Sequence, residues 1–155
     1  MILSITLNPL LERRLIYNKI NNGEVNRTET EVYKAGGKGI NVNRQLNFLG
    51  IQSAGLTFLG GNNGKMLRKI LTEEEINFTA VNTKNETRSG CLAIDNSTKT
   101  ISTFFGPNPV LLSEEINEFE QRLEKAILNS SIVVISGSSP SPLADEIFIK
   151  TIELC

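Results

Sequence analysis

The stretch AGGKGINVNR (Ala35–Arg44) packs three glycines around a lysine and continues directly into a helical pattern. Glycines let backbone N–H groups approach a ligand closely, and the N-terminus of the following helix adds a partial positive charge, so an anion is favoured there. Lys38 would add a full charge. The alternative is a glycine-rich turn that only connects a strand to a helix. The stretch therefore predicts a strand–loop–helix unit with a candidate phosphate site at the loop.

Neither this loop nor a second glycine-rich stretch, GGNNGKM (Gly60–Met66), carries a nucleotide-binding motif. A P-loop has a longer spacer before its Gly-Lys pair and a serine or threonine after it, and the latter position holds Gly39 or Met66 here. Neither stretch fits the G-x-G-x-x-G pattern of dinucleotide-binding folds. We therefore predict neither kind of site at either place.

Apolar runs alternate with amphipathic segments along the chain, a pattern that favours an α/β fold. Strands buried on both faces are expected at 2–7 and 53–61, and the β-branched run 132–135 favours a central strand. Helices are expected from the glycine loop to Gly50, over 64–76, from Ser113 and from about Pro142. Their apolar faces are predicted to contain Val42, Leu46 and Leu49; Met66, Leu67, Ile70 and Leu71; Ile116, Phe119, Leu123 and Ile127; and Leu143, Ile147 and Ile152.

Two other segments predict strands outside the core. Residues 11–34 contain β-prone pieces broken by NNGE at 21–24, and they are interpreted as exposed antiparallel strands. Residues 91–105 predict a hairpin that turns at Asp95–Thr98. Ligands of open α/β sheets bind beyond the carboxyl ends of the strands, so the loop at 136–140 is a second place where a site is expected.

Composition excludes several classes of function. The chain has 16 basic and 17 acidic residues, a net charge of −1 and no long basic run, so no nucleic-acid or membrane partner is expected. It has no histidine, which excludes a histidine general base and the Ser-His-Asp and Cys-His nucleophile arrangements. Cys91 and Cys155 lack zinc-site spacing, and no secretory signal or membrane-length apolar run is present. These features predict a cytoplasmic protein with a small-molecule partner.

Four motifs occur in a particular order: LNP at 7–9, AGGKGINV at 35–42, TR at 87–88 and SGSSP at 136–140. Together they resemble the ribokinase-like (PfkB) carbohydrate kinases, and among these the sugar-phosphate branch of 1-phosphofructokinase and tagatose-6-phosphate kinase. The resemblance extends over all 155 residues. It implies a parallel central sheet flanked by helices, with a small β-sheet lid whose strands lie near 11–34 and 89–105.

The same resemblance implies the residues that bind a sugar phosphate. Gly37, Lys38 and Asn41 would contact the phosphate that the sugar already carries, rather than a phosphate of ATP. Arg88 would add a planar guanidinium that matches phosphate oxygens, and Ser138 would add a hydroxyl donor. Without the resemblance, Arg88 would be interpreted as a solvated surface charge and Ser138 as the cap of the next helix.

The sugar side of the site departs from the family pattern. Glu12 stands where the family usually has an aspartate that binds sugar hydroxyls, and it is one methylene longer. Ser139 replaces a leucine, and Gly90 replaces an asparagine that is often found there. Arg27, in the lid, is a weaker candidate for a phosphate contact and by default a solvated strand residue. These changes either weaken the binding of the sugar or indicate a sequence that is no longer under strict functional constraint.

The sequence also lacks the Gly-x-Gly-Asp motif that supplies the family's general base, together with the anion hole and the ATP pocket. The resemblance therefore implies that 1–155 is the N-terminal half of an ATP- and Mg²⁺-dependent kinase, inactive by itself. Such a kinase would phosphorylate tagatose 6-phosphate or fructose 1-phosphate to the bisphosphate. The alternative is a truncated, non-catalytic relative that binds sugar phosphate or forms a homodimer through its exposed lid strands.

Overall fold

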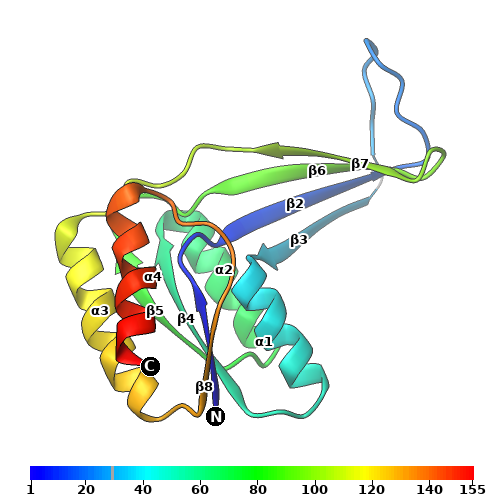
Figure 1. Cartoon of the computed structure of the whole chain (residues 1–155). Coiled ribbons are helices and arrows are strands. Elements are labelled where there is room, and N and C mark those ends of the chain that lie inside the picture. Colours follow the sequence, from blue (N-terminus) through cyan, green and yellow to red (C-terminus); the bar gives the residue numbers. More distant parts are fainter. Residues whose placement is uncertain (29) are drawn as a thin grey trace.

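The computed structural model describes residues 1–28 and 30–155, and within them it shows a parallel sheet with helices on both faces and a second sheet that forms a lid (Figure 1). The main sheet has the strand order β5–β4–β1–β8, with β1 at Ile2–Thr6, β4 at Ser53–Gly60, β5 at Phe78–Thr83 and β8 at Ile132–Ile135. The helices are α1 (Lys38–Phe48), α2 (Gly61–Glu73), α3 (Ser113–Leu128) and α4 (Pro142–Leu154). The α/β prediction is therefore confirmed.

The strand β1 is buried because its alternate side chains face two different layers. Leu3 and Ile5 face a cluster formed with α3 and α4, in which the rings of Phe58 and Phe119 stack at 4.4 Å. On the other face, Ser4 Oγ donates a hydrogen bond of 2.9 Å to the carbonyl oxygen of Gly39, at the start of α1. The strand thus holds the first turn of α1 directly against the sheet.

The glycine at position 39 is required by this packing. A Cβ there would lie 2.6 Å from the carbonyl oxygen of Ile5 and would also collide with the side chain of Thr6. Only glycine lets α1 approach β1 so closely. Part of the glycine-rich loop therefore reflects helix–sheet packing rather than ligand contact.

The lid consists of β2 (Leu10–Tyr17), β3 (Thr30–Gly36), β6 (Ser89–Asp95) and β7 (Thr100–Phe105) in the order β3–β2–β6–β7. The predicted hairpin is confirmed, because β6 and β7 pair antiparallel on either side of a short turn. Strand β2 pairs antiparallel with β3 but parallel with β6. Every residue of β7 is exposed, and the loop after β2 projects from the far end of the lid (Figure 1).

Some local predictions are wrong. β8 is an edge strand within the described residues, and Ile132 is 54% exposed, because β1 is its only partner there. The buried face of α1 contains Gly39, Ile40 and Asn43, whereas Leu49 is 59% exposed. Exposed residues on the other helices also include some that were expected in the core: Met66, Leu143 and Ile152. In the described part of the chain, no helix has the length and apolar character needed to span a membrane.

Candidate functional site

The strand order places a site between β1 and β8. The chain leaves β1 towards β4 and β5 and later returns to the opposite side of β1 as β8, so the direction of winding reverses there. Such a reversal opens a crevice at the carboxyl ends of the strands. A cavity of about 460 Å³ lies at this end, beneath the lid, and is lined by Thr6, Asn8, Leu10, Glu12, Gly37, Lys38, Asn41, Arg88, Phe105, Ser136, Gly137 and Ser138.

The N-terminus of α1 opens into this cavity. Gly37 precedes the helix with a φ of 136°, and no side chain caps the first turn. A Cβ at Gly37 would lie 2.8 Å from Thr6 Cγ2, so the loop must pass close to the end of β1. Lys38 is the first residue of the helix, is exposed, and forms no ion pair within residues 1–28 and 30–155. Uncapped N–H groups and a lysine make this end of α1 suitable for an anion.

Arg88 brings a second positive charge from the segment that enters the lid. Its Nη2 donates to the carbonyl oxygen of Asn8 at 3.1 Å, and its Nε donates to that of Pro9 at 3.4 Å. Burial lowers the pKa of Arg88 from its usual value, but arginine stays protonated near neutral pH. No carboxylate pairs with Arg88 in the part of the chain that the structure describes. Its charge is therefore available to an anion in the cavity.

Two asparagines link Arg88 to the loop after β8. Asn8 Nδ2 donates to Asn108 Oδ1 at 3.0 Å and to Ser138 Oγ at 3.3 Å, and Arg88 Nη1 donates to the same Asn108 oxygen at 3.4 Å. Asn8 is buried, and its Oδ1 finds no donor among the described residues. Asn8 belongs to the LNP motif but was not predicted to have a role in the site, and Asn108 was not predicted at all. The position of Asn8 directly after a buried strand was the available signal.

Glu12 contributes a carboxylate to the cavity and Asn41 a neutral amide, and a neighbouring arginine holds each of them in place. Glu12 Oε2 accepts hydrogen bonds from Arg14 Nη2 at 2.7 Å and Nε at 3.0 Å. Its Oε1 occupies space left by Gly36, where a Cβ would lie 2.5 Å away. Asn41 Oδ1 accepts a hydrogen bond from Arg44 Nη1 at 2.6 Å, and the amide Nδ2 has no acceptor among the residues that the structure describes. An acceptor and a donor held in this way suit the hydroxyls of a polar ligand.

Six of the seven residues singled out from the sequence line this one cavity: Glu12, Gly37, Lys38, Asn41, Arg88 and Ser138. Arg27 does not line it. Arg27 is exposed in the loop between β2 and β3. This loop lies at the end of the lid far from the main sheet (Figure 1). Phe105 lines the cavity and was not predicted to do so.

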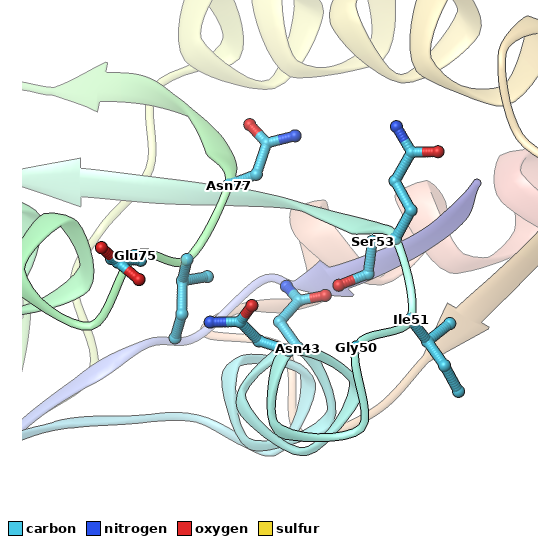
Figure 2. Close-up of a pocket in the computed structure, with 9 residues that line it drawn as sticks. Asn43, Gly50, Ile51, Ser53, Glu75 and Asn77 are labelled. Atoms are coloured by element: carbon cyan, nitrogen blue, oxygen red, sulfur yellow. The ribbon is translucent and has the colours of Figure 1, made fainter.

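A second cavity, of about 280 Å³, lies at the opposite end of the main sheet, between the end of α1 and the start of β4 (Figure 2). Asn43 is 2% exposed there, and its Oδ1 has no hydrogen-bond partner among the described residues. Glu75 is the only charged side chain in the lining, which consists of Asn43, Asn47, Gly50, Ile51, Gln52, Ser53, Glu75, Ile76 and Asn77. Without a cation, this cavity does not suit an anionic ligand.

Comparisons with known proteins agree with the fold. A model described as pfkB family carbohydrate kinase matches residues 4–155. The chain is 30% identical over 155 residues to 1-phosphofructokinase of Bacillus subtilis (strain 168), with 100% of this chain and 50% of that protein covered. The chain thus spans about half the length of that relative.

Solved structures give the same picture. A possible 1-phosphofructokinase of Thermotoga maritima superposes with a TM-score of 0.90 and 31% identity, with 99% of this chain and 51% of that one covered. Phosphofructokinase-2 of Escherichia coli, solved in complex with fructose-6-phosphate, superposes with a TM-score of 0.86 and 26% identity. That comparison covers 99% of this chain and 52% of the other.

Proposed function

Given that this chain belongs to the pfkB family of carbohydrate kinases, we propose that it supplies the acceptor site for an ATP-dependent sugar-phosphate kinase. The substrate would be a ketohexose phosphate, tagatose 6-phosphate or fructose 1-phosphate, which is converted to the bisphosphate. One observation carries the proposal: Lys38, Arg88 and the uncapped start of α1 converge on one cavity, with no carboxylate paired to either cation in the described residues.

In this proposal, different residues of the cavity bind the phosphate and the sugar hydroxyls of the substrate. Lys38, Arg88 and the N–H groups of the α1 first turn bind the phosphate already on the sugar, with Ser138 as a further donor. The Nδ2 of Asn41 donates a hydrogen bond to the same phosphate, and Glu12 accepts one from a sugar hydroxyl. These contacts hold the substrate in one orientation, so that its free primary hydroxyl stays in a fixed position. Fixing the acceptor lowers the entropic part of the barrier to transfer.

ATP and Mg²⁺ would supply the transferred phosphoryl group and neutralise its charge. The described residues contain no group of three or more acidic, cysteine or histidine side chains that could hold a metal ion. We assign this chain the binding and orientation of the acceptor, and we expect the 155 residues alone to show no turnover.

The exposed β7 strand also supports the proposal that two copies pair through their lids. One edge of β7 has no partner strand within residues 1–28 and 30–155, and the apolar side chains of Ile101 and Phe104 are exposed. Both features favour strand pairing. Sedimentation velocity over a range of concentrations tests this proposal. Ile101→Lys should shift any dimer towards monomer, and a chain that stays monomeric at every concentration would exclude the dimer.

Calorimetric titration of the chain tests the proposed substrate. Tagatose 6-phosphate and fructose 1-phosphate should bind, whereas unphosphorylated tagatose and fructose should bind far more weakly because they lack the anion. ATP serves as a second anionic ligand, and a kinase assay runs in parallel. Equal binding of tagatose and its 6-phosphate would overturn the assignment of the cationic groups to a sugar phosphate.

A further inference from the structure

Phe105, the last residue of β7, lies against Arg88 within the candidate site. The guanidinium carbon of Arg88 lies 5.5 Å from the centre of the Phe105 ring. At this distance the ring face attracts the cation. The guanidinium donates through Nε and Nη2 to the carbonyl oxygens of Pro9 and Asn8 and through Nη1 to Asn108 Oδ1. An arginine side chain has five N–H donors, so donors remain for an anion.

Gly90 provides the space for this ring. Gly90 and Phe105 are directly opposite one another in the pairing of β6 with β7. A Cβ at Gly90 would lie 2.6 Å from Phe105 Cδ1 and 3.2 Å from Cε1. The φ of Gly90 is not positive, so the backbone would accept another residue. The ring of Phe105 is therefore the nearest obstacle to a side chain at position 90, and the carbonyl oxygen of Phe104 follows at 3.1 Å.

The pair explains a departure that the sequence left open. A family asparagine at position 90 would clash with the ring, so Gly90 and Phe105 belong together.

We propose that Phe105 is a positioning residue that holds the Arg88 guanidinium in the plane needed to bind the substrate's phosphate, in space that Gly90 leaves open. This inference rests on the proposed function for its ligand. A planar guanidinium binds two phosphate oxygens only when its N–H edge points at them, so a group that fixes its plane raises affinity without touching the phosphate.

The test combines binding with a measurement on the ligand-free chain. In the ligand-free chain, the NMR signals of the Arg88 side chain should carry a ring-current shift that Phe105→Leu removes and Phe105→Tyr keeps. In calorimetry, Phe105→Leu should weaken tagatose 6-phosphate binding about threefold to fivefold, and Phe105→Tyr should restore it. Phe48→Leu is the control, because Phe48 is an exposed phenylalanine at the last position of α1 and does not line the candidate site. It should leave the affinity unchanged.

Two double variants show whether Phe105 acts through Arg88 and against Gly90. Phe105→Leu should have no further effect in an Arg88→Ala background. Gly90→Ala should weaken binding in the wild-type chain but not in a Phe105→Ala background, where the ring is gone. An effect of Phe105→Leu that persists without Arg88 would overturn the positioning role.

The ring-current measurement and the binding measurement together distinguish a failure of this inference from a failure of the proposed function. Absence of the ring-current shift would overturn the stacking of Arg88 on Phe105, whatever the chain binds. A wild-type chain that shows the shift but binds no sugar phosphate would overturn the proposed function and the phosphate-binding part of the inference, while the packing of Arg88 on Phe105 would stand.

Discussion

The two ends of the main sheet each carry a polar cavity, but only one of them suits an anion. The cavity at the carboxyl ends of β1 and β8, of about 460 Å³, contains Lys38 and Arg88. The cavity at the opposite end, of about 280 Å³, is lined by amides and one carboxylate, Glu75 (Figure 2). Polarity is common to both cavities, so the charges and the direction of the nearby helix decide what each can bind.

Helix α1 makes the difference clear because it contributes to both cavities. Its first residues, Lys38 and Asn41, line the carboxyl-end cavity, while Asn43 and Asn47 line the other. The helix dipole is positive at its N-terminus and negative at its C-terminus. The same helix therefore attracts an anion at one end of the sheet and repels it at the other.

Removing a cation from the carboxyl-end cavity should have the largest effect on the difference in anion binding between the two cavities. A charge-assisted hydrogen bond contributes about 1.5–3 kcal/mol, so Arg88→Ala should weaken tagatose 6-phosphate binding about 10- to 100-fold. Lys38→Ala should act in the same direction, with a smaller effect because the lysine is exposed. Calorimetric affinities measure both effects. Glu75→Gln, which changes a charge in the opposite cavity, is the matched control and should leave the affinity unchanged.

The packing of α1 against β1 can be tested separately from its charge. Gly39→Ala places a methyl group against the carbonyl oxygen of Ile5, so it should lower the free energy of unfolding by about 1–3 kcal/mol. Urea denaturation followed by circular dichroism measures this loss. Gln45→Ala, at an exposed position of the same helix, is the control. Equal stability of the two variants would show that Gly39 is not required by packing.

A smaller effect is expected at the lid turn, far from both cavities. Asp95 accepts hydrogen bonds from the Ser97 side chain and from the backbone N–H groups of Ile20, Ser97 and Thr98, and these lower its pKa from 3.8 to about 2. Because the folded pKa is the lower one, the carboxylate stabilises the fold fully above about pH 4, and this contribution is lost as the pH falls towards 2.

Asp95→Asn isolates this contribution. The wild-type chain should lose more stability than Asp95→Asn between pH 4 and pH 2, as measured by thermal unfolding at each pH. Sugar-phosphate binding at neutral pH should be the same in both. If the wild-type chain and Asp95→Asn lose the same stability between pH 4 and pH 2, the Asp95 carboxylate does not stabilise the turn.

The site residues that could be predicted from the sequence lie within short motifs. The glycine loop lies between a buried strand and a helix, so Gly37, Lys38 and Asn41 could be placed from neighbouring residues and from the family resemblance. Arg88 and Ser138 followed from their motifs in the same way. The fold class followed from the alternation of apolar runs and amphipathic helices.

The parts that were missed depend on contacts between distant segments. Asn108 and Phe105 join the site because the end of the predicted β6–β7 hairpin lies beside the carboxyl ends of the main-sheet strands, and no local pattern specifies how the lid sits on that sheet. β8 was expected at the centre of the sheet because its residues are β-branched, but strand order depends on pairing rather than on composition. The buried face of α1 was misjudged because it is formed by Gly39, Ile40 and Asn43 rather than by the apolar set Val42, Leu46 and Leu49.

The most direct test of the difference between the two ends is a titration of the isotopically labelled chain with tagatose 6-phosphate, followed by amide NMR. The account predicts shifts at residues 37–41, 88 and 136–138, which line or adjoin the carboxyl-end cavity, and none at 50–53 and 75–77. Shifts confined to the opposite end, or spread equally over both, would contradict the claim that charge and helix direction define the binding site.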